Sequence, residues 1–357
     1  MFWPDTISKK LGIEYPVIQA PMFGVSTVQM VAAATRAGCL GSLALADLSA
    51  EESIKLIRET RKLTDKPFAA NIFVHHIPEI TEPLRLKFIK TRQFLKQLAK
   101  DNDIEVNFPD LEDLNVRSYH ELVDVVIKEN CKILSFTFGN LDDQNIQKLK
   151  ENGVTLIGTC TSVNEALILE KSGIDIICVQ GIEAGGHRGT FDPDHVLQIG
   201  GLSLLSQVYD HVKVPLIYAG GIYNGKTLQA VKNLGAQGFQ VGNLLLASCE
   251  SALQPFEKER LKKAKENEIM LTKSFSGRYA RGVKNKYIEA VEDSEYILPY
   301  PYQNKLTNAL RKAAKSKQNA DFVGIWIGQS LHDYSELSAE EILKNLIFQV
   351  EENEMKL

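Results

Sequence analysis

The chain has 357 residues, of which 44% are hydrophobic and 24% charged, a composition typical of a globular protein with two domains or one large one. Its 41 Lys and Arg nearly balance 45 Asp and Glu, so it lacks the basic excess with which proteins bind nucleic acid or anionic membrane surfaces. No apolar run approaches the roughly 18 residues that cross a bilayer, and the start, MFWPDTISKK, does not have a signal-peptide pattern. We therefore expect a cytoplasmic protein that binds neither nucleic acid nor membrane.

The five cysteines are scattered along the chain, and none forms a C-x-x-C pair. An odd number without such spacing argues against a disulfide framework and against a zinc site. We expect most of them to be reduced thiols in the core, and we predict no metal site.

Short apolar runs recur at regular intervals, and each predicts a strand. They are nearly continuous in apolar residues, which is typical of strands buried on both faces in a parallel sheet. Eight alternations of strand and helix favour a (β/α)8 TIM barrel, in the α/β class, and the same alternation permits a doubly wound open sheet. The predicted strands are 16–20, 40–45, 68–74, 132–137, 155–158, 175–179, 215–219 and 238–241.

Amphipathic windows between these runs predict the helices. Ser162 followed three residues later by Glu165 is a capping-box pattern that opens one of them. Gly153 and Gly173 fall where a helix should stop before the next strand. The clearest windows are 49–61, 164–171, 203–211 and 226–233.

Two segments do not fit the repeat. Residues 75–116 form a long insertion after the third strand, and such an insertion in a barrel usually covers the catalytic face or makes an interface. We therefore predict a barrel from 1–74 and 117–253, with a smaller, mainly helical region made by the insertion and by a C-terminal extension, 254–357, that contributes to a substrate cap.

The first strand ends in QAPM, residues 19–22. Pro21 fixes the turn, and Met22 offers a soft apolar surface suited to lying under a flat ring, although a turn with core packing explains both residues equally simply. Asn71 in the third strand and Gln180 after the sixth are amides in apolar surroundings. Because a buried amide needs hydrogen-bond partners, both suit the edge of a heterocycle.

The richest loop follows the sixth strand and reads QGIEAGGHRG, residues 180–189. Gly185 and Gly186 let the backbone approach a ligand closely and point N–H groups at an anion. His187 lies among these glycines and carries a side chain that exchanges protons near neutral pH. We predict a catalytic role for His187, whereas a lone histidine elsewhere is more often a core residue.

Two further glycine-bearing loops follow the last two strands, at AGGI (219–222) and QVGN (240–243). In (β/α)8 enzymes these loops commonly bind a phosphate group through backbone N–H groups. Tight turns without a ligand are the alternative. The chain contains neither a nucleophile elbow nor a Gly-Lys-Ser loop, which excludes covalent acyl chemistry and nucleotide hydrolysis of those kinds.

These motifs, in this order, resemble the nitronate monooxygenase family, formerly called 2-nitropropane dioxygenases. The segments SFSGRYARG (274–282), PYPYQNKLTNALRKAA (299–314) and IWIGQS (325–330) also resemble it, so the resemblance runs nearly end to end. It implies an FMN-dependent (β/α)8 flavoprotein that oxidises alkyl nitronates with dioxygen and needs no nicotinamide cofactor. The expected partners are a small-molecule nitronate and dioxygen, and the oligomeric state, a homodimer included, stays open.

The resemblance places flavin contacts on Asn71, Gln180, Gly185, Gly221 and 240–243, and it places the histidine beside the flavin on His187. Family members often have Thr at the position of Asn243, and both side chains can donate to a phosphate. Together the loop patterns and the resemblance predict cofactor contacts from Ala20, Pro21, Met22, Asn71, Gln180, Gly185, Gly186, Gly220, Gly221, Gln240, Val241, Gly242 and Asn243.

The expected substrate pocket departs from the family pattern at one position. Many members have a second His in a motif written S-F-H-F-G, where this chain has Thr137. His75 or His76 could take over its function. The remaining residues that the resemblance places near the pocket, without assigned roles, are Tyr296, Tyr300 and Lys305.

His187 can act in two ways. A charged or donating imidazole would hold the oxygens of an anionic nitronate, and a neutral one could remove the carbon-bound proton of a nitroalkane. Since the chain is nearly neutral, the positive potential that attracts an anion must be local, and we expect it near His187 and Arg188. Two other functions remain open: a flavin-dependent enoyl-acyl-carrier-protein reductase that uses a nicotinamide nucleotide, and a flavin-free barrel that binds a phosphorylated metabolite.

Overall fold

Eight parallel strands form the central sheet of the computed structural model, which describes residues 3–46 and 48–355. The sheet order is β1-β9-β8-β6-β5-β4-β3-β2, and every neighbouring pair is parallel. All eight predicted runs coincide with strands. These are β1 (Val17–Gln19), β2 (Gly41–Ala46), β3 (Phe68–Phe73), β4 (Ile133–Thr137), β5 (Thr155–Cys160), β6 (Ile176–Gln180), β8 (Leu216–Ala219) and β9 (Gly238–Val241).

The two edges of this sheet meet and close it into a barrel. Ile18 of β1 pairs with Leu40 just before β2, and Leu40 accepts a hydrogen bond from Gln19 N at 2.9 Å and donates one to Val17 O at 2.9 Å. The (β/α)8 prediction is therefore confirmed, and the doubly wound open sheet is wrong, because an open sheet would leave β1 and β2 as separate edges.

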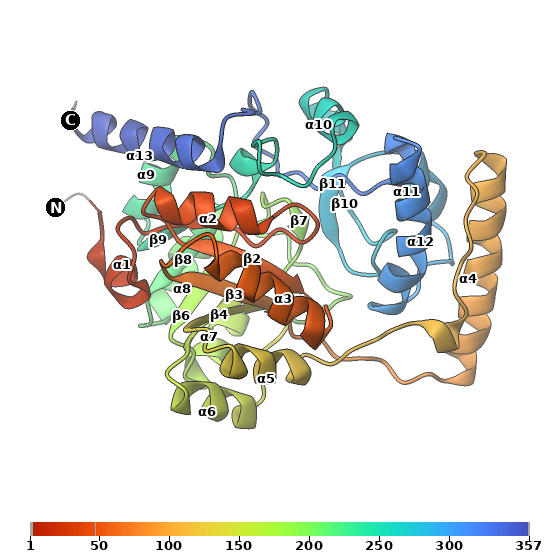
Figure 1. The fold of residues 1–357 in the computed structure, drawn as a ribbon, viewed down its shortest axis with the longest axis horizontal. Coiled ribbons are helices and arrows are strands. Elements are labelled where there is room, and N and C mark those ends of the chain that lie inside the picture. The colour runs from red at the N-terminus through yellow and green to blue at the C-terminus, as the bar shows by residue number, and fades with distance from the viewer. Residues whose placement is uncertain (1–2, 47, 356–357) are drawn as a thin grey trace.

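Helices surround the barrel (Figure 1). The predicted windows agree with α3, α7, α8 and α9 to within two residues. The helices that follow the eight strands are α2 (Val28–Arg36), α3 (Ala50–Arg61), α5 (His120–Lys128), α6 (Asp143–Glu151), α7 (Val163–Lys171), α8 (Gly201–His211), α9 (Gly225–Asn233) and α13 (Ala339–Met355).

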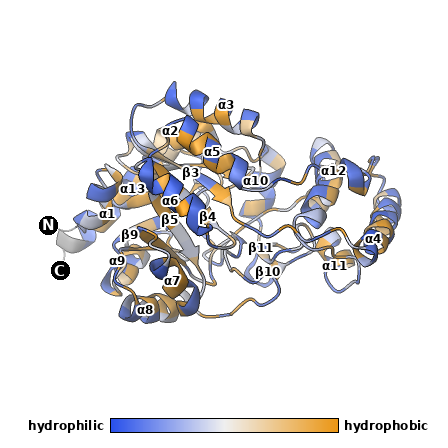
Figure 2. Cartoon of the chain, turned by 90° about the horizontal axis from the view of Figure 1, so that it is seen from below, coloured by the Kyte–Doolittle hydropathy of each residue, from blue (hydrophilic) through white to orange (hydrophobic). Residues whose placement is uncertain are grey.

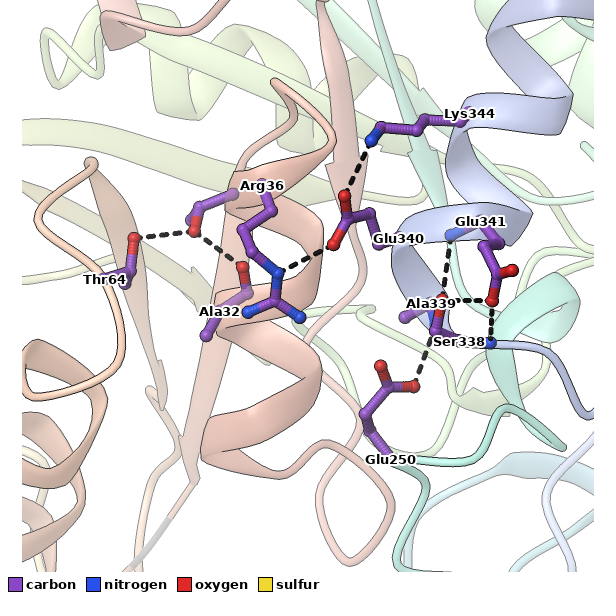
Figure 3. A network of polar contacts seen from close by, with 10 residues as sticks. Ala32, Arg36, Thr64, Glu250, Ser338, Ala339, Glu340, Glu341 and Lys344 are labelled. Atoms are coloured by element: carbon purple, nitrogen blue, oxygen red, sulfur yellow. Dashed lines mark hydrogen bonds and ion pairs between the residues drawn. The ribbon is translucent and has the colours of Figure 1, made fainter.

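The last of these, α13, comes from the C-terminal extension and packs against α2 and α9. Figure 3 shows its first turn, where Glu340 accepts a hydrogen bond from Arg36 of α2 at 2.7 Å and the N–H of Ala339 donates to Glu250 at 2.8 Å. The extension 254–357 thus supplies the eighth barrel helix as well as residues over the strand ends. The predicted division of the chain into a barrel, an insertion and an extension stays a prediction. Its ranges include residues 1–2, 47 and 356–357, which lie outside the described part.

Local signals at the helix ends explain why the elements begin and end where they do. The hydroxyl of Ser162 accepts the N–H of Glu165, as the capping pattern predicts. The carboxylate of Glu165 does not return to Ser162; it accepts hydrogen bonds from the N–H and hydroxyl of Thr161 instead. Gly153 and Gly173 follow their helices with φ of 68° and 79°, the left-handed conformation that favours glycine.

The barrel interior forms a small apolar core, in which Ile18, Leu40 and Ile217 pack together. The preceding helix α1 (Asp5–Leu11) adds Ile7 and Leu11 to this core and so covers the end of the barrel where the strands begin. A larger core lies between the strands and the outer helices and continues into the C-terminal region. None of the described helices has the length and apolar character needed to cross a membrane.

Four cysteines are buried, and Cys249 is exposed. Burial raises the pKa of the Cys178 thiol to about 12 and that of Cys131 to about 11. Among the described residues all five are free thiols, and those in the core behave as small apolar side chains.

The insertion and most of the C-terminal extension lie together beside the barrel, with α4 standing at the outer side of α11 and α12 (Figures 1 and 2). We call this region the cap. Phe94 of α4 stacks on Tyr296 at 4.5 Å, and Tyr302 of α12 donates a hydrogen bond to Pro78 O at 2.6 Å. Its elements are α4 (Glu82–Asp101), η1 (Leu111–Asp113), α10 (Pro255–Lys262), η3 (Glu266–Glu268), β10 (Ile269–Thr272), β11 (Ala280–Val283), α11 (Lys286–Val291), α12 (Tyr302–Ser316) and η4 (Ala320–Phe322).

The cap contains a three-stranded sheet that the sequence does not predict. Its order is β10-β11-β7, and both pairings are antiparallel. The strand β7 (Gly186–His187) belongs to the glycine-rich loop that follows barrel strand β6. The predicted catalytic loop is therefore part of the sheet that joins the barrel to the cap.

Candidate active site

The loop that carries His187 is fastened on both sides. His187 pairs with Ala280 of β11, and the N–H of Arg188 donates to Tyr279 O at 2.8 Å. On the barrel side, Gln180 donates from Nε2 to His187 O at 3.0 Å and accepts the N–H of Gly189 at Oε1, at 2.8 Å. The amide of Gln180, predicted to contact the cofactor, thus holds the backbone of this loop.

The sequence predicts that Arg188 supplies positive potential to a substrate, but its side chain is buried in the protein. It is 1% exposed, and it donates to Gly181 O at 2.5 Å and to Gln180 O at 2.9 Å. Because its guanidinium points back at carbonyls of its own loop, Arg188 stabilises the loop conformation. The positive charges that lower the pKa of His187 belong to Arg278 and Arg311.

His187 lies in an aromatic enclosure. Its ring is 5.5 Å from that of Phe138, 5.6 Å from that of Trp326 and 6.3 Å from that of Phe73, and its Nε2 is 2.8 Å from the hydroxyl of Ser276. Burial lowers the pKa of His187 to about 3, and the positive charges of Arg278 and Arg311 add to this effect. The imidazole is therefore neutral near neutral pH, with two positive charges close enough to affect its pKa.

Phe138, directly after β4, forms one wall of this enclosure in an unusual backbone conformation. Its φ is 82°, although it is not glycine, and it is 2% exposed. The guanidinium of Arg278 lies 4.3 Å over its ring, and the ring of Tyr300 is 5.6 Å away. Residues held in this region of φ cost about 1–3 kcal/mol and cluster at functional sites, so Phe138 marks the site independently of His187.

The other residues expected near the pocket are distributed around it. His75 contacts Tyr300, with ring centroids 4.7 Å apart, and the ring of Tyr300 is in turn 5.6 Å from that of Phe138. Thr137 packs under the loop: a Cβ placed on Gly189 would lie 2.7 Å from its hydroxyl. It therefore supports the loop at the position where many family members have a second imidazole.

Tyr296 and Lys305 lie farther out. Tyr296 stacks on Phe94 in the cap. Lys305 lies on α12, and its charge slightly lowers the pKa of Glu52 on α3, a shift due mainly to hydrogen bonds from Ser49. His76 is exposed. Neither Tyr296 nor His76 makes a ring contact or hydrogen bond with His187 in the described part of the chain.

The three glycine-bearing loops meet at the ends of β6, β8 and β9. Gly220 and Gly221 have φ of 124° and 68°, so this turn requires glycine. A Cβ on Gly220 would lie 3.3 Å from Ala184 N, which places the loop after β8 against the loop after β6. A Cβ on Gly242 would lie 3.3 Å from the sulfur of Met22 and 3.2 Å from Ala20 Cβ, which joins the QAPM segment to the loop after β9.

The QAPM segment also contacts the end of β9 through its backbone. Ala20 donates a hydrogen bond to Val241 O at 2.8 Å, so the ends of β1 and β9 are held together around Pro21 and Gln240.

Asn71 of β3 is 4% exposed and donates from Nδ2 to the hydroxyl of Ser135 on β4, at 2.9 Å. Its Oδ1 accepts no hydrogen bond from the described residues, so this carbonyl is available to a donor on a ligand.

Residues 327–331, which we call the strap, connect these loops. A Cβ on Gly185 would lie 2.6 Å from Gly328 N, so the strap presses directly on the loop after β6. Ser330 donates to Gly221 O at 3.2 Å. Asn243 accepts the N–H of Gly328 at 2.9 Å and donates to Ser330 O at 2.7 Å.

The side chain of Asn243 therefore holds the strap, and the group it leaves for a phosphate is its backbone N–H. This differs from the expectation that the side chain donates to the phosphate, because both hydrogens of its amide are already directed at Ser330 O and at the Tyr334 hydroxyl, 3.3 Å away. The QAPM segment and the three glycine-bearing loops thus come together, but the side chains of Gln180 and Asn243 bind protein groups.

Four residues of the site escape prediction from local pattern: Phe138, Ser276, Arg278 and Ser330. Ser276 and Arg278 lie in SFSGRYARG and Ser330 ends IWIGQS, two segments whose resemblance to the family was their only signal. Phe138 lies in residues 135–139, which resemble the family motif S-F-H-F-G, and this resemblance was its only signal. The fold and this site together define a (β/α)8 barrel enzyme with a glycine-lined cradle beside an enclosed imidazole.

Comparison with known proteins agrees with this class. The chain matches the nitronate monooxygenase family over residues 5–349. It is 37% identical over 350 residues to a protein of Staphylococcus saprophyticus named "probable nitronate monooxygenase", with 96% of each chain covered. A protein of Bacillus subtilis with the same name is 36% identical over 343 residues, covering 95% of this chain and 96% of its own.

Solved structures give the same picture. The nitroalkane oxidase of Streptomyces ansochromogenes has a TM-score of 0.88 and 31% identity, covering 98% of this chain and 99% of its own. FabK of Thermotoga maritima has a TM-score of 0.74 at 24% identity, covering 98% and 97%, and this likeness concerns the fold alone. The chain belongs to the nitronate monooxygenase family and is an oxidoreductase.

Proposed function

We propose that the protein oxidises alkyl nitronates with dioxygen, using bound FMN, and releases a carbonyl compound and nitrite. The observation that carries this proposal is the state of His187: a neutral imidazole, enclosed by aromatic rings, under the positive charges of Arg278 and Arg311. A nitronate is an anion with an apolar alkyl part, and this site suits both parts.

The strand ends fit a flavin phosphate. Gly185, Gly221 and Gly242 leave backbone accessible at the strand ends, and the strap holds these loops in one arrangement. Backbone N–H groups at such a turn bind phosphate oxygens. When bound there, FMN would accept electrons from the substrate and pass them to dioxygen. Asn71 Oδ1 and the apolar surface of Met22 suit a ring edge and a ring face.

His187 would accept the carbon-bound proton when the substrate is a neutral nitroalkane. A ring nitrogen that carries a lone pair takes this proton, and the imidazole becomes positive beside the nitronate that has just formed. The charges of Arg278 and Arg311, which add to the effect of burial on the pKa of His187, stabilise that anion. A nitronate supplied from solution needs no proton removal and gains the same stabilisation.

A base with a pKa of about 3 is weak, and this predicts a preference between substrates. We expect kcat/KM to be higher for a nitronate than for its parent nitroalkane, because only the nitroalkane depends on proton transfer to His187. Replacing His187 by Asn should leave bound flavin in place and remove most turnover of the nitroalkane. The matched control is His195→Asn, since the His195 side chain is 82% exposed.

Anaerobic mixing of the purified protein with a nitronate tests the proposal. Bleaching of the flavin absorbance, followed by nitrite when air is admitted, is the expected result. Rapid bleaching by NADH or NADPH and none by a nitronate would favour an enoyl reductase. A colourless protein that takes up no FMN would favour a barrel that binds a phosphorylated metabolite, and full nitroalkane activity in His187→Asn would remove His187 from the mechanism.

A further inference from the structure

Ser276, in the cap, makes three hydrogen bonds with one hydroxyl group. Its Oγ is 2.8 Å from Nε2 of His187, 3.0 Å from Arg278 O and 3.2 Å from Arg278 N. Ser276 is 2% exposed and Arg278 is 4% exposed, so water does not replace any of these partners easily. The direction of each hydrogen bond then decides where His187 carries its proton.

A serine hydroxyl has one hydrogen to donate and two lone pairs that accept. The carbonyl of Arg278 can only accept, so the hydroxyl hydrogen of Ser276 is directed at it. The N–H of Arg278 takes one lone pair. The remaining lone pair faces Nε2 of His187, and this contact is a hydrogen bond only if Nε2 carries the hydrogen.

The opposite arrangement is less favourable. If the hydroxyl hydrogen pointed at His187, the carbonyl of Arg278 would lose its only donor among the described residues. A buried carbonyl without a donor is costly, because its desolvation is not compensated. The backbone of Arg278 in the cap therefore favours the tautomer of His187 that carries its hydrogen on Nε2.

We propose that Ser276 is a positioning residue that holds neutral His187 as the tautomer with hydrogen on Nε2 and a free lone pair on Nδ1. Nδ1 makes no hydrogen bond to the described residues, and His187 is half-buried, with the rings of Phe73, Phe138 and Trp326 around it. Nδ1 is then the atom that takes the substrate proton. The role in turnover rests on the proposed function; the tautomer itself does not.

The tautomer can be observed directly in the FMN-loaded protein. Histidines labelled with 15N give separate signals for protonated and unprotonated ring nitrogens in a two-bond 1H–15N spectrum, and the spectrum of His187→Asn identifies the signals of His187. We expect hydrogen on Nε2 in the wild type and in Ser276→Thr, which keeps the hydroxyl. We expect Ser276→Ala to populate the Nδ1–H form.

Hydrogen on Nδ1 in the wild-type spectrum would overturn the proposal, and so would a Ser276→Ala spectrum identical to that of the wild type. The wild-type spectrum decides the question even if Ser276→Ala does not fold. These outcomes do not depend on nitronate turnover, so failure of the proposed function would be distinguishable.

Kinetics separate positioning from a merely structural role. If hydrogen on Nδ1 becomes the form of about nine-tenths of His187 in Ser276→Ala, kcat for a nitroalkane should fall about tenfold, within the roughly 10²–10⁴-fold that general-base catalysis contributes. The same variant should retain most of its activity on the nitronate, and Ser276→Thr should restore the nitroalkane reaction. An equal loss on both substrates would indicate only general disruption of the site.

Discussion

Acid should destabilise the protein through His187, and the environment of this residue sets the amount. Its pKa is about 3 in the folded protein, against an ordinary value of 6.5. Between these values the unfolded chain binds a proton that the folded protein does not, so the stability that the neutral imidazole contributes is present above pH 6.5 and is lost as pH falls. At pH 5, 1.5 units below the ordinary value, the loss is about 2 kcal/mol at about 1.36 kcal/mol per unit.

Urea denaturation at pH 7.5 and pH 5, with excess FMN, measures this loss. Other titrating groups also contribute, and comparison with His187→Asn removes them because they are common to both proteins. The wild type should lose about 2 kcal/mol more than the variant between the two pH values. His195→Asn should behave as the wild type, since His195 is largely exposed. Equal losses in the wild type and His187→Asn would refute the account of His187 as a neutral, desolvated group.

Three other predictions concern the loops around this residue. Asn243→Ala should raise the rate of FMN release, measured by flavin fluorescence, because the strap loses the hydrogen bonds to Gly328 N and Ser330 O. Gly185→Ala should also weaken FMN binding in a titration, since its Cβ would lie 2.6 Å from strap backbone. Glu165→Gln should lower the free energy of unfolding by about 1–3 kcal/mol, because the carboxylate accepts four buried or part-buried hydrogen bonds.

The barrel could be predicted because its signals are local. A strand buried on both faces must be apolar along its length, and a helix that turns back to the sheet ends best at a glycine with positive φ, as at Gly153 and Gly173. Each of these patterns is complete within a few residues. Their order along the chain then gives the topology, since each parallel connection requires a crossover.

The pairing of β7 with β11 could not be predicted in the same way. A strand of two residues, Gly186–His187, has no periodicity, and its partner Ala280 lies far along the chain. The side-chain roles depend on such long-range contacts. Gln180 and Asn243 have the right chemistry for a ligand, and only the positions of His187 O, Gly189 N, Gly328 N and Ser330 O show that protein groups engage them.

The groups around His187 come from two separate parts of the chain. Residues of the barrel supply His187, Phe73 and Phe138, whereas Arg278, Ser276 and Trp326 come from the C-terminal extension. Arg278 is held by donation to Thr190 O and Phe191 O, at 2.7 and 3.2 Å, and by its place over Phe138.

The positive charges that act on His187, those of Arg278 and Arg311, thus both come from the C-terminal extension. Because Ser276 hydrogen-bonds His187 and Arg278 lowers its pKa, both the proton position and the charge of the imidazole depend on this contact. Any change that separates β7 from β11 should therefore remove nitroalkane turnover before it disturbs the barrel itself, whose closure by β1 and β2 involves none of these residues.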